Sequence, residues 1–178
     1  MSRDHGDDHV REHEHESEAD VAAYLKERVY ATFTGLAIVL VLAANVDEHT
    51  AEAALFSLVI GVLGITVAGY ASDMIAHLAV HRTLPERSEH GRMIRVAGGA
   101  ISTVILPAIL LGLAWAGVFQ LVGALRAVTI VYLVTLAAIA YLAVRRARLS
   151  WWMQLAALLS LVLLGGIVVV LQTLAHAD

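Results

Sequence analysis

Five uncharged stretches, each at least 18 residues long, fill almost all of the chain after Glu27: residues 29–46, 53–72, 96–125, 127–144 and 149–177. A bilayer core about 30 Å thick is crossed by roughly 20 apolar residues in a helix, so each stretch is long enough to span a membrane. None shows the two-residue alternation of membrane-barrel strands. Because unpaired backbone groups cost several kcal/mol each in hydrocarbon, the spans are expected to be helices.

Composition supports the same fold class. Hydrophobic residues make up 59% of the 178 residues and charged residues only 16%, which is more apolar surface than a soluble core of this size can bury. The sequence therefore predicts an all-α integral membrane protein, a bundle of five transmembrane helices near residues 29–46, 53–80, 96–118, 124–144 and 151–175. The chain has no cysteine, which excludes disulfides and thiolate metal sites.

Eleven of the twelve Lys and Arg residues fall before the first span or in the connections between spans two and three and between spans four and five. They are Arg3, Arg11, Lys26, Arg28, Arg82, Arg87, Arg92, Arg95, Arg145, Arg146 and Arg148. Because cationic loops stay on the cytoplasmic side during insertion, we expect a cytoplasmic N-terminus and an external C-terminus. The excess of Arg over Lys suggests a GC-rich bacterial genome, so the expected location is a bacterial inner (plasma) membrane.

Residues 1–16 are mostly acidic residues and histidines with almost no apolar side chains, so this segment is predicted to be a disordered cytoplasmic tail. Its four histidines are His5, His9, His13 and His15. Dense imidazoles and carboxylates can capture divalent cations weakly, and a helix would align the first three histidines. A solvated tail that binds no metal is the alternative reading.

The polar tail is followed by a segment with a different pattern. Ser17 and Asp20 form a capping-box pattern, and Val21, Tyr24 and Arg28 then recur at three- and four-residue spacing. This pattern predicts a short amphipathic helix lying at the cytoplasmic interface and leading into the first span. Residues 17–178 are taken as the transmembrane domain.

Polar residues suited to chemistry gather at the cytoplasmic end of the second span. Asp73, His77 and His81 are spaced by four residues, so on a helix they form a stripe along one face. A carboxylate with two imidazoles can bind Zn²⁺, Fe²⁺ or Mn²⁺, and the same groups can relay protons. The alternative is interfacial electrostatics, with Asp73 paired to Arg82 or Arg145.

Small residues recur at four-residue spacing in two spans. Gly64, Ala68 and Ser72 follow this spacing in the second span, and Gly98 and Ser102 follow it in the third. Membrane helices approach one another closely along such small residues. We therefore expect these two faces to pack against neighbouring helices.

Residues 27–36, Glu-Arg-Val-Tyr-Ala-Thr-Phe-Thr-Gly-Leu, resemble the start of the vacuolar iron transporter family, whose first span opens with Glu-Ile-Val-Phe-Gly-Leu-Asn-Asp-Gly-Leu. The sequence Ala-Ser-Asp at 71–73 is placed like that family's Ala-Gly-Glu. The resemblance implies a homodimeric, proton-coupled exporter of Fe²⁺ and Mn²⁺. The chain departs from the family at Thr34, which replaces a transport Asp, and at Gly69, which replaces a Met ligand; it also lacks the cytoplasmic metal-binding domain.

Three functions follow as hypotheses. The first is divalent-cation transport, with the lipid bilayer, the cation and a second copy of the chain as partners and no nucleic acid. The second is a non-transporting membrane module or assembly subunit whose tail binds a partner or a metal. The third, a metal-dependent hydrolase built on Asp73 and His77, is disfavoured because one helix supplies every candidate ligand and no His-Glu-x-x-His motif occurs. We therefore expect a protein that is not an enzyme.

Overall fold

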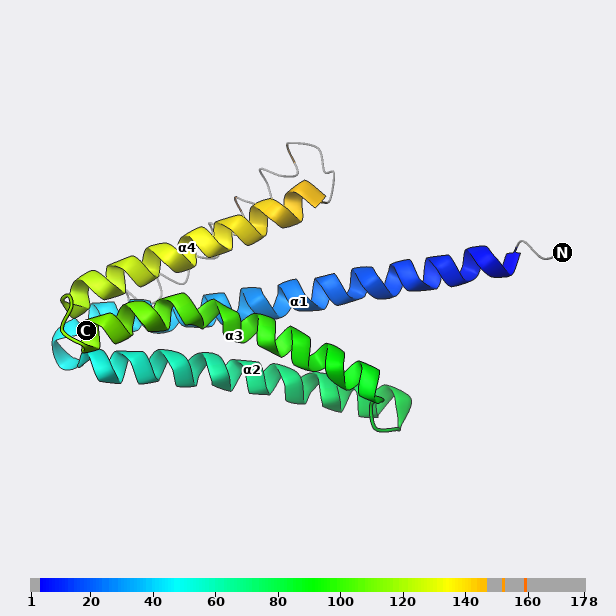
Figure 1. Ribbon diagram of the computed structural model, residues 1–178, viewed down its shortest axis with the longest axis horizontal. Helices are drawn as coiled ribbons and strands as arrows, with labels where there is room; N and C mark the ends of the chain where they lie inside the picture. The colour runs from blue at the N-terminus through cyan, green and yellow to red at the C-terminus, as the bar shows by residue number, and fades with distance from the viewer. Residues whose placement is uncertain (1–3, 147–151, 153–158, 160–178) are drawn as a thin grey trace.

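The computed structural model describes residues 4–146, 152 and 159, and this part of the chain is helical with no strand. Its elements are α1 (Asp4–Ala44), the short 3-10 helix η1 (Val46–Glu48), α2 (Ala51–His81), α3 (Arg87–Trp115) and α4 (Leu121–Arg146) (Figure 1). Four segments are long and apolar enough to cross a membrane: Asp20–Ala44, Ala51–His81, Arg87–Trp115 and Leu121–Ala143. The all-α class is confirmed, and the chain is a multi-pass membrane protein. The predicted fifth span, 151–175, falls almost entirely outside the described residues.

α1 is one continuous helix from Asp4 to Ala44, so the described backbone forms no separate interfacial helix before the first span. Disorder of the tail over 1–16 stays a prediction. No glycine or proline occurs between Gly6 and Gly35 to interrupt the helix, and acidic residues near a helix N-terminus interact favourably with its dipole. Asp20 accepts a hydrogen bond from Arg92 of α3 at 2.8 Å. This contact ties α1 to α3 ahead of the first uncharged stretch.

α2 and α3 are joined by a short turn, residues 82–86. α2 ends at Arg82, whose φ of 56° is in the left-handed region that commonly terminates helices. α3 begins at Arg87 and not near residue 96 as predicted, because Glu86 and Glu89 form a reciprocal capping box. The third span thus extends outward by more than two helical turns and carries polar residues to the end of the bundle.

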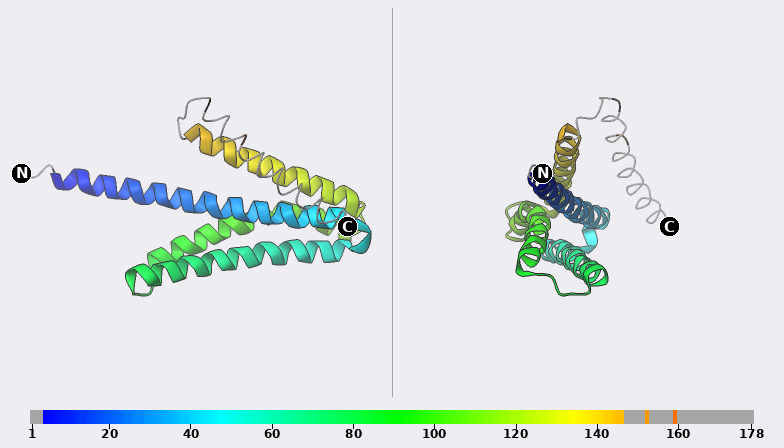
Figure 2. Two further views of the ribbon diagram at one scale, coloured as in Figure 1. Left: turned by 180° about the vertical axis from the view of Figure 1, so that it is seen from behind. Right: turned by 90° about the vertical axis from the view of Figure 1, so that its right-hand side faces the viewer.

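α1 and α3 each pack against the other three helices, with α2 and α4 on opposite sides of that pair. The α1–α2 and α3–α4 connections lie together at one end of the bundle, and the α2–α3 turn lies at the other (Figure 1). Beyond the α2–α3 turn, the N-terminal part of α1 projects away from the other helices, as Figure 1 and the left view of Figure 2 show. The described bundle therefore has two connections at one end, and the α2–α3 turn with the helical extension of α1 at the other.

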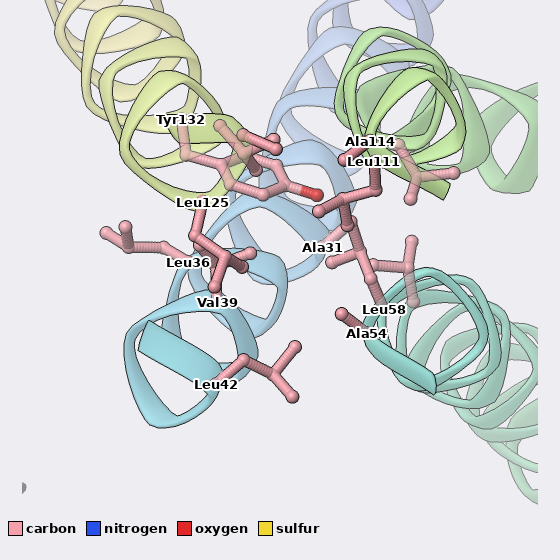
Figure 3. Packing of buried hydrophobic residues seen from close by; sticks show 14 of the residues in the cluster. Ala31, Leu36, Val39, Leu42, Ala54, Leu58, Leu111, Ala114, Leu125 and Tyr132 are labelled. Atoms are coloured by element: carbon pink, nitrogen blue, oxygen red, sulfur yellow. The ribbon is translucent and has the colours of Figure 1, made fainter. Parts of the chain in front are cut away.

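Each helix contributes fully buried apolar side chains to a common core, among them Val39, Leu58, Leu111 and Leu125 (Figure 3). Tyr132 is also completely buried, and its ring lies against Gly35 of α1. The outward faces are apolar as well. Side chains at least half exposed include Ile60, Val67, Ile105, Ile130 and Val134. Apolar residues on both inner and outer faces are expected when lipid, and not water, surrounds the bundle.

The predicted close-packing faces make no close contact with another helix of the described bundle. A Cβ atom added at Gly64 or Gly98 would have no atom within 4 Å among the described residues, so these glycines do not face a described helix. The close contacts are instead at Gly69 on α2 and at Gly99 on α3, where an added Cβ would collide with side chains of α1. Gly99 lies directly against the ring of Tyr24.

Candidate functional site

A pocket of about 290 Å³ lies between α1, α2 and α3 at the end of the bundle that carries the α2–α3 turn. Its lining residues are Ala23 from α1, Asp73, Ala76, His77, Val80 and His81 from α2, and Arg92, Met93 and Val96 from α3. All three residues predicted from the spacing on the second span therefore face one cavity. The other predicted residues, in the tail, lie elsewhere.

α2 places Asp73, His77 and His81 on successive turns because it remains a regular helix up to His81. The rings of His77 and His81 lie 4.6 Å apart, centroid to centroid, with 34° between their planes. The His77 side chain is 12% exposed, Asp73 is half-buried and His81 is exposed. The stripe thus runs from the solvent-exposed rim of the pocket to its interior.

Asp73 makes no hydrogen bond and no ion pair with any residue in the described part of the chain. The alternative prediction, pairing with Arg82 or Arg145, is not found in this structure. Arg92, the cation that does line the pocket, is instead paired with Asp20 at 2.8 Å. Among the described residues, the Asp73 carboxylate therefore has no protein partner beside the cavity.

Two contacts join α2 to α3 around the pocket. His77 Nε2 lies 3.6 Å from Glu89 Oε2, a pair that is ionic when the imidazole is protonated. The same Glu89 oxygen accepts a hydrogen bond from the Glu86 backbone N–H at 2.9 Å, so this carboxylate caps α3 as well. The Tyr70 hydroxyl and His90 Nε2 are 2.8 Å apart. These contacts make the start of α3 part of the pocket wall.

Glu27 was not singled out from the sequence, yet it is the one charged residue classed as buried in the described bundle, only 7% exposed. Its carboxylate lies against Gly69 of α2, where an added Cβ would come within 2.5 Å of Oε2. Lys26 Nζ, on a half-exposed side chain, is 3.7 Å from the other oxygen. The absence of a side chain at Gly69 leaves the room that the carboxylate occupies.

Glu27 lies deeper in the bundle than the pocket. Ala23 and Asp73 line the pocket, and the pair Glu27 and Gly69 follows four residues further inward on each of the two antiparallel helices, which is about one turn. The sequence signal for Glu27 is its place at the start of the segment 27–36 that resembles the vacuolar iron transporters, four residues before Ala31, which is buried on α1.

No group of three or more His, Cys, Asp or Glu residues in the described part of the chain could hold a metal ion. Asp73, His77 and His81 line one pocket, but the three do not form such a group. In the tail, His5, His9 and His13 are placed on successive turns of α1, and His15 falls off that face. Metal binding at either set stays a prediction.

The resemblance to vacuolar iron transporters rests on two segments. Residues 27–36 lie on α1 and begin at the buried Glu27, and residues 71–73 lie on α2 and end at Asp73 in the pocket lining. Comparison with protein-family models, with characterised proteins and with solved structures finds no match to this chain.

Proposed function

We propose that the chain is a membrane transport protein that accepts a metal cation from the cytoplasm, Fe²⁺ or Mn²⁺ by its resemblance to vacuolar iron transporters. The observation that carries the proposal is the buried Glu27 carboxylate, one turn beyond the pocket that holds Asp73. An ionisable group inside a membrane span is costly and is usually kept for a pathway or a binding site. The two carboxylates give a cation a first and a second position along one route.

The rest of the bundle is consistent with a route that is open at the pocket end and closed toward the opposite end. Beyond Gly69, α2 buries Thr66 and then the apolar side chains Val62, Leu58 and Ala54. The Thr66 hydroxyl donates to the Val62 carbonyl at 2.8 Å, so it keeps a lone pair for a passing ion. Apolar residues from all four helices then close the route toward the opposite end. Transport would require the helices to separate there, as in alternating access.

Orientation is part of the proposal, because the described cations are concentrated at the pocket end while Asp47, Glu48 and Glu52 lie at the other. Since the chain contains no cysteine, single cysteines can report the topology. Leu84→Cys lies in the α2–α3 turn and Val118→Cys in the α3–α4 connection; both positions are more than 60% exposed. In intact cells a membrane-impermeant maleimide should label only the cysteine at 118. Labelling at 84 alone would reverse the orientation.

Transport itself is tested by metal-dependent flux in reconstituted vesicles. Asp73→Asn keeps the size of the side chain and removes its charge, so flux of Fe²⁺ or Mn²⁺ should fall roughly tenfold while folded yield is unchanged. Asp47→Asn is the matched control, since Asp47 is an exposed carboxylate at the opposite end. Full flux through the Asp73 variant, or no flux through the folded wild-type protein, would refute the proposal.

A second candidate, a non-transporting membrane module, is favoured by the helical extension of α1. The N-terminal part of α1 continues beyond the α2–α3 turn (Figure 2), and its sequence is acidic and rich in histidine. Such an extension can dock a cytoplasmic partner or collect metal. This candidate would replace the first if the wild-type protein folds, inserts and carries no cation flux, and if deletion of residues 1–16 removes bound partner protein without affecting folding.

A further inference from the structure

Met93 of α3 is the residue that brings sulfur to the pocket lining. It is only 6% exposed and lies beside Arg92, with Asp73, His77 and His81 lining the same cavity from α2. A thioether is a soft, uncharged and polarizable ligand, which binds soft cations in preference to Mg²⁺, Ca²⁺ or Mn²⁺. The placement of Met93 therefore bears on which cation the pocket can select.

The two histidines are suited to act together with this sulfur. Imidazoles four residues apart on one helical face are a recurrent metal-chelating pair. Glu89 Oε2 lies 3.6 Å from Nε2 of His77, so a carboxylate stands beside one of the two ring nitrogens. A carboxylate beside the second nitrogen is the usual support of a histidine that binds metal.

The charge of the pocket argues against a hard divalent cation. Asp73 is the only acidic residue in its lining, and Arg92 adds a positive charge that is paired with Asp20. Hard divalent cations need several oxygen ligands, and the described residues gather no three acidic or imidazole groups for one ion. A monovalent cation costs less beside Arg92 and is satisfied by few nitrogen and sulfur ligands.

From this geometry we propose that His77, His81 and Met93 form a site for a soft monovalent cation, Cu⁺ or its redox-inert analogue Ag⁺. The assignment keeps the transport route of the proposed function, on which it rests, but replaces Fe²⁺ or Mn²⁺, the ions that the resemblance implies, with Cu⁺ as the cargo. Binding, however, can be measured without transport. Asp73 at the inner side of the stripe would balance the charge of the bound ion and pass it toward Glu27.

The test is Ag⁺ binding to the full-length protein in detergent, followed by competition with an excess of Mn²⁺. Met93→Leu preserves shape and removes the sulfur, so the affinity of one Ag⁺ site per chain should fall roughly tenfold or more. Met74→Leu is the matched control, because Met74 is a half-buried methionine of α2 outside the pocket lining. Tail histidines contribute the same background to both variants.

His81→Gln is a second variant, and because His81 is exposed the substitution should not disturb folding. It should weaken the same Ag⁺ site to a similar extent. Equal affinity in the Met93 and Met74 variants, or displacement of Ag⁺ by Mn²⁺, would overturn the assignment. Tight, sulfur-dependent Ag⁺ binding without cation flux would instead refute transport and leave the site in place. Mn²⁺ flux that does not depend on Met93, together with unchanged Ag⁺ affinity, would support transport and refute the site.

Discussion

Glu27→Gln is expected to lower metal-dependent flux in reconstituted vesicles by roughly tenfold or more, with folded yield unchanged or improved. Glutamine occupies nearly the same volume beside Gly69, but it carries no charge to attract the ion. Burial of a carboxylate opposes folding unless the charge is compensated, and the nearest cation, Lys26, is half-exposed at 3.7 Å. The substitution should therefore separate function from stability.

Glu52→Gln is the control for this measurement, because Glu52 is an exposed carboxylate in the first turn of α2 at the opposite end. Its flux should match the wild type. If the Glu27 variant transports at the wild-type rate, the buried carboxylate has no part in the route. The burial of Glu27 would then no longer support the proposed transport function.

A single methyl group should have opposite effects at two helical glycines. Gly35→Ala would place Cβ against the hydroxyl and Cζ of Tyr132, whose side chain is completely buried and cannot move aside (Figure 3). Overpacking of this kind costs about 1–3 kcal/mol, which outweighs the roughly 1 kcal/mol that alanine gains over glycine in a helix. At Gly64 nothing lies within 4 Å, so Gly64→Ala should keep the gain in helix propensity.

Thermal unfolding of the two variants in the same detergent gives the comparison. We expect a lower melting temperature for Gly35→Ala and an equal or higher one for Gly64→Ala. Stabilisation by alanine at position 35 would mean that α1 and α4 do not approach each other as closely as Tyr132 requires. Destabilisation at position 64 would mean that another surface covers this face of α2.

The spans were predictable because each is a local property of the sequence. A long uncharged run identifies a membrane helix wherever it packs, and each of the four candidate spans found among the described residues overlaps such a run. Which face turns inward was not predictable. In a helix that is apolar all round, Gly64 and Gly69 look equivalent, and only the carboxylate of Glu27 in the folded bundle distinguishes them. Periodicity carries little information when lipid takes the place of water.

The contrast between local patterns and packing between helices also explains which residues of the candidate site could be predicted. Asp73, His77 and His81 could be grouped from the sequence because a regular helix brings residues four apart onto one face. Glu27 and Met93 reach the same region from α1 and α3, through contacts between residues far apart in the chain. The capping box at Glu86 that starts α3 early was needed to bring Met93 to the pocket, and it was not recognised.

The unbroken course of α1 has a mechanical consequence. At 1.5 Å per residue its 41 residues form a rod roughly 60 Å long, with no proline or flexible joint between the acidic N-terminal turns and Glu27. The rotational phase of the outer segment is therefore fixed relative to the buried carboxylate, and inserting one residue after Ser17 would turn that segment by about 100°. Any torque or tilt imposed on the outer turns is transmitted to Glu27 itself.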